Sequence, residues 1–425
     1  MHPPATTAGL SHRAAAAYSP PMMQAAPTTE VLIAGGSYAG LALASALARE
    51  TGGDVSVTVV SPSFPNLDTS AVAHDTRASA LSRGSLNLLS KLGAWSALQP
   101  QAQIVRSIDL TDSALTDALR PTVLTYDLSA DRDASMPAMV IVENHLLGAA
   151  LHQAAVTSPG VTVISGRTVT AIATGPNNLR ATLSSGETLD ARLLIAADGP
   201  RSKLRGLSGI KTIGWPYAQS GIITVVTPEL AHNGRAMQHF LPGGPFALLP
   251  MTGNRICVTW TETAAEANRI LALDSAGFRA EVEQRFGHGL GALKIISPPR
   301  TWPLEMTVAR SLIAPRFALA GDAAHSVHPI AGQGLNLGFR DVATLTSCII
   351  DAARLGLDIG AAAPLERYER ERRFDNLACA SAFDALNRLF STDSTLARSA
   401  RGAALNLANT MPALKSWLIT EASGG

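Results

Sequence analysis

The segment from Gly321 to Gly338, GDAAHSVHPIAGQGLNLG, carries the most informative pattern of the chain. It follows a short apolar run at 317–320, which predicts a buried strand. Asp322 at the end of that strand can accept hydrogen bonds from sugar-like hydroxyls, and the glycines beyond it let the backbone approach a flat ligand. A helix predicted to begin there presents free N–H groups and its positive dipole end. This combination suits a flavin, which carries a ribityl chain and gains negative charge on reduction.

A second glycine-rich turn, Gly35 to Gly40, lies between a predicted strand at 30–34 and a predicted helix at 41–50. This order is typical of a dinucleotide site, where a pyrophosphate lies at the helix N-terminus. Two positions depart from the usual pattern, because Ser37 replaces the second glycine and Ser61 stands where an acid is expected after the second strand. Both serines can still bond a phosphate or a ribose hydroxyl. The alternative is a tight corner that binds nothing.

Two further motifs could contribute to the same site. Arg77, before a predicted helix at 79–98, could bind a pyrophosphate bidentately or could instead pair with Asp75 at the surface. Asp198 and Gly199 form a turn directly after a predicted apolar strand. Since Asp-Gly turns are common, this turn is a weak signal by itself.

Composition excludes several classes of protein. The 425 residues carry a formal net charge of +1, which gives no global field for nucleic acid. The three cysteines are far apart, so they predict neither a metal site nor a disulfide framework. No run of 18 apolar residues predicts a transmembrane helix. Residues 1–28, rich in Ala, Pro, Ser and Thr, are expected to form a disordered leader.

The order of the motifs indicates how the chain is divided. Residues 30–60 predict a β–α–β unit and a parallel sheet, residues 217–262 predict antiparallel strands, and the chain beyond 337 is mostly helical. Because the glycine-bearing turns recur early, in the middle and late, we expect a cofactor domain that the chain enters three times. The expected boundaries are 29–105, 140–205 and 300–345 for the cofactor domain, 106–139 and 206–299 for an inserted substrate domain, and 346–425 for a helical region.

In order and approximate spacing, these motifs resemble those of the class A flavoprotein aromatic hydroxylases, the group that includes p-hydroxybenzoate hydroxylase. More narrowly, the chain resembles the ubiquinone-biosynthesis hydroxylase family, from about residue 29 to the C-terminus. The segments that carry the resemblance are 75–95, 143–147, 215–221, 239–250, 302–304, 321–341, 368–373 and 389–391.

The resemblance implies an α/β fold: a discontinuous Rossmann-like FAD-binding domain, an inserted, mainly antiparallel β-sheet substrate domain and a C-terminal helical region. It implies FAD as the cofactor and NAD(P)H as a co-substrate that has no domain of its own. The expected cofactor-binding residues, from the motifs and the resemblance together, are Gly35, Ser37, Gly40, Ser61, Arg77, Asp198, Gly199, Asp322, Pro329, Gly332, Gly334, Leu335 and Asn336.

The implied activity is hydroxylation of the aromatic ring of a polyprenylated phenol in ubiquinone biosynthesis, using NAD(P)H and O2 through a flavin hydroperoxide. The implied location is the cytoplasm, where the enzyme could meet other ubiquinone-biosynthesis proteins and the inner face of the membrane. A base that activates the phenol would help, but no residue is selected. The candidates are Tyr217, His239, His325 and His328.

Several alternatives stay open at this point. The same scaffold could serve a hydroxylase of small soluble aromatics, an epoxidase or a prenyl reductase, because fold alone does not set the reaction. The departures at Ser37 and Ser61 leave room for a non-catalytic assembly protein. The apolar side chains that could line a substrate pocket, or could equally be ordinary core, are Phe240, Phe246, Leu248 and Leu249.

Overall fold

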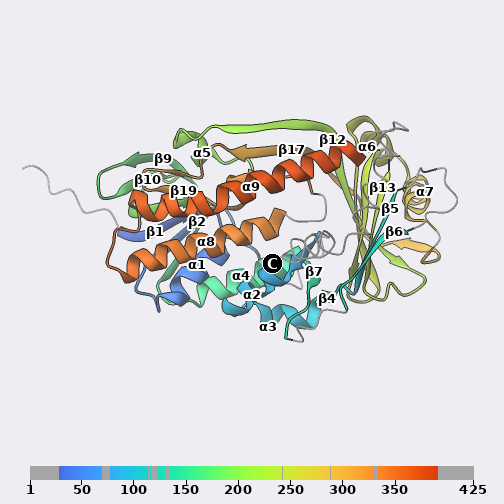
Figure 1. Ribbon diagram of the computed structural model, residues 1–425, viewed down its shortest axis with the longest axis horizontal. Coiled ribbons are helices and arrows are strands. Elements are labelled where there is room, and N and C mark those ends of the chain that lie inside the picture. The colour runs from blue at the N-terminus through green and yellow to red at the C-terminus, as the bar shows by residue number, and fades with distance from the viewer. Residues whose placement is uncertain are drawn as a thin grey trace, which may run out of the picture.

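The structure, a computed structural model, describes residues 28–68, 77–112, 115, 122–129, 135–241, 243–287, 289–329 and 334–390. Figure 1 shows an elongated molecule with a parallel sheet at one end and a larger sheet at the other. Helix α9 (Ala362–Phe390) runs from the first end toward the second, alongside α8 (Gly334–Arg354). The predicted leader lies outside the described residues except for Thr28, which begins the first strand. Residues 391–425 lie outside them as well.

The first sheet has a parallel centre. Its strands follow the order β19, β11, β1, β2, β8, and each adjacent pair is parallel. The hairpin strands β9 and β10 and the short strand β18 extend it by antiparallel pairing. The bounds are β1 (Thr28–Ala34), β2 (Val57–Ser61), β8 (Val161–Ser165), β9 (Val169–Thr174), β10 (Leu179–Leu183), β11 (Thr188–Ala196), β18 (Ile313–Ala314) and β19 (Phe317–Leu319). Strands from three distant parts of the sequence thus make one sheet, which confirms the predicted discontinuous Rossmann-like fold.

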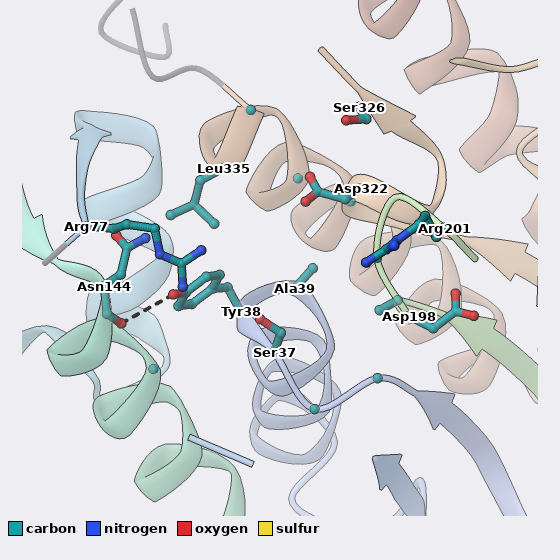
Figure 2. A pocket seen from close by; sticks show the side chains of 18 of the residues that line it. Ser37, Tyr38, Ala39, Arg77, Asn144, Asp198, Arg201, Asp322, Ser326 and Leu335 are labelled. Carbon is teal, nitrogen blue, oxygen red and sulfur yellow. Dashed lines mark hydrogen bonds between the residues drawn. The ribbon is translucent and has the colours of Figure 1, made fainter. Parts of the chain in front are cut away.

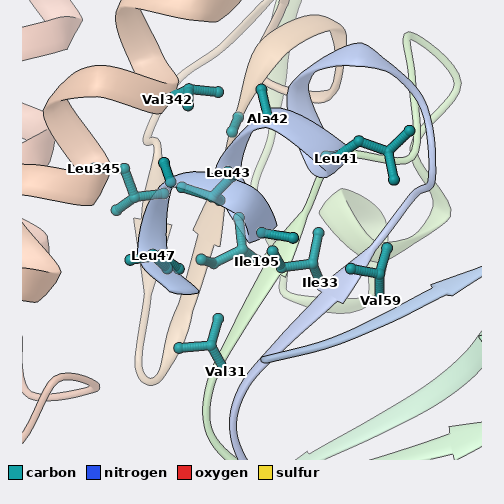
Figure 3. Packing of buried hydrophobic residues seen from close by; sticks show 14 of the residues in the cluster. Val31, Ile33, Leu41, Ala42, Leu43, Leu47, Val59, Ile195, Val342 and Leu345 are labelled. Atoms are coloured by element: carbon teal, nitrogen blue, oxygen red, sulfur yellow. The ribbon is translucent and has the colours of Figure 1, made fainter. Parts of the chain in front are cut away.

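Helix α1 (Tyr38–Glu50) lies between this sheet and α8. Its alanine- and leucine-rich sequence is buried from Gly40 to Ala48, because one side meets the strands and the other meets a helix. Figure 3 shows Leu43 and Leu47 of α1 close to Leu345 of α8, with Ile33 of β1 beneath them. Small residues at the helix surface permit this close packing. A further helix, α4 (Asn144–Val156), packs beside α1.

The second sheet is mainly antiparallel. Its main path runs β20, β17, β12, β15, β14, β13, β5, β6, and only β13 and β5 pair in parallel. The bounds are β5 (Ser107–Asp112), β6 (Thr122–Asp127), β12 (Thr212–Pro228), β13 (Arg235–Leu241), β14 (Gly244–Met251), β15 (Arg255–Thr263), β16 (Leu293–Ile295), β17 (Arg300–Ala309) and β20 (His325–Ser326). One face packs on α6 (Ala264–Leu271) and α7 (Ser275–Phe286) through Phe246, Trp260 and Phe278. The predicted, mainly antiparallel sheet is confirmed, and its other face is left to meet the first sheet.

The helix predicted at 79–98 differs from the structure at its start. Residues Ala78–Ser82 form strand β3, which pairs with β7 (Met139–Glu143), and β4 (Gln103–Ile104) pairs with β7 on its other side. Helix α2 (Arg83–Lys91) begins only after Ser82, whose side chain caps it, and α3 (Trp95–Leu98) follows. Pairing with a strand 60 residues distant therefore overrides the local helical preference. No helix among the described residues has both the length and the apolar composition needed to span a membrane.

Candidate active site

A cavity of about 1310 Å³ opens where the carboxyl ends of the parallel strands face the antiparallel sheet. Ala34, Ser61, Ala197 and Ala320, at or just beyond the ends of β1, β2, β11 and β19, all line it. Ligands of open α/β sheets bind at this edge because the strand-to-helix turns gather there. The opposite wall is one face of the antiparallel sheet. We call the side formed by the strand-to-helix turns the wall of turns, and the opposite side, formed by the antiparallel sheet, the wall of sheet.

The turn before α1 is shaped for close backbone approach. Gly35 has a φ of +122°, and a Cβ there would lie 2.1 Å from the carbonyl oxygen of Ala197. A Cβ on Gly40 would lie 1.9 Å from the carbonyl oxygen of Gly35, so Gly40 supports the turn from beneath and does not line the cavity. Ser37 is the N-cap but makes no side-chain cap hydrogen bond. The first-turn N–H groups of α1 therefore remain for a phosphate.

Arg77 enters the cavity beside α1 and α4, as Figure 2 shows. Its carbonyl oxygen accepts from the backbone N–H of Asn144 (2.9 Å), and the hydroxyl of Tyr38 donates to the Asn144 carbonyl (3.4 Å). The Asn144 side chain accepts from the Ser79 hydroxyl (2.7 Å). Asp75, the alternative partner of Arg77, lies outside the described residues. The guanidinium is thus positioned at the same end of the cavity as the α1 N-terminus.

The second predicted turn, Asp198–Gly199, also lines the cavity. Gly199 has a φ of +88°, with open space where a Cβ would be. Arg205, in α5 (Lys203–Leu207), donates to the carbonyl oxygens of Pro200 (3.0 Å) and Ala323 (2.8 Å). Burial lowers the pKa of this guanidinium. Arg205 therefore joins the middle turn of the sequence to the late one.

Asp322 lies in the one-turn 3-10 helix Gly321–Ala323, directly after β19, and lines the cavity. Its side chain keeps contact with solvent through the cavity, yet the walls desolvate the carboxylate and raise its pKa. Figure 2 shows it near the N-terminal end of α1, between Ser326 and Ala39. A hydroxyl-bearing ligand chain would satisfy this carboxylate by hydrogen bonding.

A buried ion cluster holds the Asp322 turn from behind. The fully buried Asp341 of α8 accepts from His325 Nε2 (2.6 Å), from the backbone N–H of Gly321 (3.0 Å) and from Arg372 Nε of α9 (2.8 Å). Burial alone would raise the pKa of Asp341, but His325 and Arg372 outweigh burial and hold it below the usual value. Sequence reasoning missed this cluster, because His325, Asp341 and Arg372 are 16 to 47 residues from one another.

None of the four candidate bases lines the cavity. His325 is committed to Asp341. The Tyr217 hydroxyl donates to Asp384 of α9 (2.8 Å), and burial raises its pKa. His239 Nδ1 shares a 2.6 Å hydrogen bond with the Thr111 hydroxyl.

The fourth candidate, His328, is 1 % exposed and packs edge-on against the Tyr217 ring. Neither of its ring nitrogens has a hydrogen-bond partner among the described residues. Burial lowers its pKa to about 4, so it is neutral at neutral pH. The structure therefore places no acid–base side chain from the predicted set at the cavity surface.

Some of the predicted residues between Pro329 and Asn336 line the cavity, and others hold neighbouring elements in place. Pro329, Gly334 and Leu335 line the cavity, and a Cβ on Gly334 would meet only Val327, at 3.8 Å. Asn336 does not line it. Its buried side chain accepts from the Ser82 N–H (3.0 Å) and the Ser85 hydroxyl (2.7 Å) and donates to the Ala80 carbonyl (2.9 Å). Asn336 thus fastens the start of α8 to β3 and α2, and Gly332 lies outside the described residues.

Ser61 lines the cavity, but its hydroxyl donates to the Ser63 carbonyl (2.6 Å), which leaves only its acceptor capacity for a ligand. Several lining residues were not predicted; they are Tyr38, Asn144 and Arg201 on the wall of turns, and Ile223, Gln238, Pro245, Ala247, Thr259, Thr261, Trp302 and Ser326 on strands of the antiparallel sheet. Of the four apolar candidates only Leu249 lines the cavity, and Phe246 and Leu248 belong to the core under α6 and α7.

No group of three or more His, Cys, Asp or Glu side chains in the described ranges is placed to hold a metal.

These features fit FAD. The glycine cradle and uncapped α1 N-terminus suit a pyrophosphate, Asp322 suits a ribityl chain, and the open space at Gly334 beside the start of α8 suits a flat ring. The cavity is large enough for a cofactor and a second ligand together, since ligand pockets usually enclose about 300–1,000 Å³.

Comparisons with known proteins agree with this geometry. Residues 28–376 match the family described as FAD binding domain. The chain is 40% identical to ubiquinone hydroxylase UbiL of Rhodospirillum rubrum (93% of this chain, 89% of the relative) and 31% identical to 3-demethoxyubiquinol 3-hydroxylase of Escherichia coli (93% and 98%). The solved structure of p-nitrophenol 4-monooxygenase PnpA from Pseudomonas putida has the same fold (TM-score 0.75, 19% identity, 94% of this chain and 99% of that one). The chain therefore belongs to the FAD-binding monooxygenase family that contains the ubiquinone-biosynthesis hydroxylases, and it is an FAD-dependent oxidoreductase.

Proposed function

We propose that this enzyme hydroxylates the aromatic ring of a polyprenylated phenol in ubiquinone biosynthesis, with NAD(P)H as reductant and O2 as the oxygen source. The single observation that carries the proposal is the two-walled cavity, in which turns that fit FAD face a mostly apolar sheet. Two relatives that match over nearly their whole length are named for hydroxylation of ubiquinone intermediates.

Each part of the wall of turns has its own task. When bound, FAD supplies the redox chemistry that brings reducing equivalents from NAD(P)H and an oxygen atom from O2 to the substrate ring. The N–H groups at the start of α1, together with Arg77, would hold its pyrophosphate, and Asp322 would hold its ribityl chain. The first turn of α8 would stabilise negative charge on the ring through its N–H groups and dipole.

The wall of sheet would hold the substrate and exclude water. Ile223, Pro245, Leu249 and Trp302 make most of its surface apolar, which favours an aromatic ring with a hydrocarbon tail. Since the predicted bases lie outside the cavity, we propose that ring activation depends on orientation rather than on one of those four side chains. A polyprenyl substrate would bring the enzyme to the inner face of the membrane, among other proteins of the pathway.

The test is oxygen incorporation. The FAD-loaded enzyme would be given a prenylated phenol, NADH or NADPH, and oxygen-18 gas, and the product mass would be measured. We expect one labelled oxygen atom in the ring, with product formation dependent on reductant. A product that gains hydrogen and no oxygen would identify a reductase, and a label on the prenyl chain would identify an epoxidase. Equal turnover of a small aromatic acid without a tail would favour a hydroxylase of soluble aromatics.

A further inference from the structure

The wall of sheet carries a small group of polar side chains whose arrangement follows from strand register. Gln238 pairs with Ala247 across β13 and β14, and Ala247 pairs with Thr259 across β14 and β15. Residues directly opposite in a sheet point to the same face, so the three form one transverse row facing the cavity. The next row contains Pro245, Thr261 and the backbone of Gly221.

Gln238 is the unusual member of this row. It is only 8 % exposed, and its side-chain amide has no hydrogen-bond partner among the residues that the structure describes. Its amide atoms are not themselves fully buried, because they open onto the cavity that Gln238 lines. A ligand in the cavity can therefore take the place of solvent as their hydrogen-bond partner.

The surroundings of Gln238 leave room for a flat ring. Gln238 and Thr259 stand two strands apart, roughly 10 Å between their Cα atoms, and only the methyl group of Ala247 lies between them. Trp302 forms a side of this space, and its ring lies over Gly221, where a Cβ would come within 2.7 Å of it. An aromatic ring could pack on Ala247, with its oxygen substituents directed at the Gln238 amide on one side and the Thr259 hydroxyl on the other.

Charge is distributed unequally between the two walls. The charged side chains that line the cavity are Arg77, Asp198, Arg201, Lys203 and Asp322, and all five lie outside the antiparallel sheet. Arg300, which is opposite Ile223 in the row of Gln238, is exposed and does not line the cavity. Within the described part of the cavity, the wall of sheet thus offers amide and hydroxyl groups but no cation for a carboxylate.

We propose that Gln238, with Thr259, recognises the oxygen substituents of an uncharged ring on the floor of Ala247, and that the substrate head group therefore lacks a carboxylate. This inference rests on the proposed function and narrows it to a phenol that has already lost, or never had, a ring acid. A carboxamide both donates to and accepts from such oxygens, whereas it cannot neutralise an anion. A buried, unpaired carboxylate would be strongly disfavoured here. Gln238 is thereby assigned as a specificity-determining residue.

The test is a binding experiment on the FAD-loaded enzyme without NAD(P)H, so that no turnover occurs. The ligands are 2-prenylphenol and 3-prenyl-4-hydroxybenzoate, which differ by one ring carboxylate, and binding is followed by the perturbation of the flavin spectrum. We expect the wild-type enzyme to bind the phenol at least tenfold more tightly than the acid. Gln238→Leu should weaken phenol binding about five- to tenfold, and Gln238→Lys should shift the preference toward the acid by tenfold or more.

The control is Thr224→Val, which removes a buried hydroxyl that donates to the Ser297 carbonyl; Thr224 alternates in β12 with Ile223 and does not itself line the cavity. It should lower the melting temperature but leave both dissociation constants unchanged, and FAD content should be equal in all variants. Three results would overturn the proposal: equal binding of acid and phenol by the wild type, no measurable phenol binding, or Gln238→Leu binding within twofold of the wild type. This experiment measures binding and no product, so its outcome does not depend on whether the enzyme hydroxylates the ring. Hydroxylation, in turn, can be measured whether or not Gln238 discriminates between the two ligands.

Discussion

The two walls of the cavity are built by different means. The wall of turns uses backbone: glycines at Gly35 and Gly199 adopt positive φ, and helix N-termini supply donors. The wall of sheet uses side chains on regular strands, with Gln238 and Thr259 set by register around Ala247. A backbone site tolerates almost no change in its glycines, whereas a side-chain site can be re-specified one residue at a time. In this enzyme, ring specificity can therefore change at the sheet while the cofactor site stays fixed, and four variants probe this difference.

The largest effect is expected from Gly35→Val on the wall of turns. Its Cβ would overlap the Ala197 carbonyl, and valine disfavours a φ of +122°, so we expect a loss of at least about 3 kcal/mol in the free energy of unfolding and no retained FAD. Chemical denaturation and flavin absorbance measure both. Gly289→Ala, at a position with open space, is the control. A stable, yellow Gly35→Val protein would show that this turn is not built on backbone fit.

Asp322→Ala should separate cofactor binding from stability. Loss of the acceptor for a ribityl hydroxyl should weaken FAD binding by about 10- to 100-fold, corresponding to ~1.5–3 kcal/mol. Because desolvation raises the pKa of Asp322, the folded state disfavours its charged form, so the FAD-free variant should be at least as stable as the FAD-free wild type near neutral pH. Fluorescence titration with FAD and thermal melts measure the two quantities. Unchanged FAD affinity would contradict the assigned role.

His328, which packs against Tyr217 and does not line the cavity, should matter only in acid. Its folded-state pKa of about 4 is below the unfolded value of ~6.5. The unfolded chain therefore takes up the proton first as pH falls below 6.5, and the free energy of unfolding declines by about 2 kcal/mol at pH 5 from this group. His328→Phe should show a correspondingly flatter decline between pH 6.5 and 4 in urea denaturation. Parallel curves for the two proteins would refute the assignment.

Ala247→Leu on the wall of sheet should have the smallest effect. The longer side chain would occupy the floor between Gln238 and Thr259, so KM for the ring substrate should rise about tenfold, or ~1.4 kcal/mol, with FAD content and melting temperature unchanged. Ala247→Ser, which is close in size, should retain the wild-type KM. If Ala247→Leu instead lost FAD, the two walls would not be independent.

The same difference explains what the sequence could predict. The turns at Gly35, Asp198 and Gly321 were found because strand, glycine and helix are neighbours in the chain, and the carboxyl edge of a parallel sheet brings them together. Gln238 was not found, because alternation in β13 places it with Ala236 and Phe240 but does not say which face meets the cavity. The Asp341 cluster was missed for a related reason, since its contacts join residues far apart in the sequence.

Asn336 shows a further limit of motif reasoning. It was expected beside the flavin, and its side chain instead holds Ser82 and Ser85 at the start of α2. The motif indicated a segment of which Pro329, Gly334 and Leu335 line the cavity, but long-range contacts set the task of Asn336. The predicted start of the helix at 79–98 was wrong for the same reason. Strand β3 occupies these residues because it pairs with β7, a partner that the local sequence does not reveal.

The two longest paired strands have a mechanical consequence. Residues 212–216 of β12 pair with 305–309 of β17, and after a register shift between Pro216 and Ser220 the same strands continue into the antiparallel sheet. This ribbon is visible along the top of Figure 1. A hydrogen-bonded ribbon resists shear, so the spacing of cofactor and substrate depends on strand length rather than on flexible linkers. Any hinge would have to act at the irregular step near Pro216, and a one-residue deletion there would shift the reacting partners relative to each other.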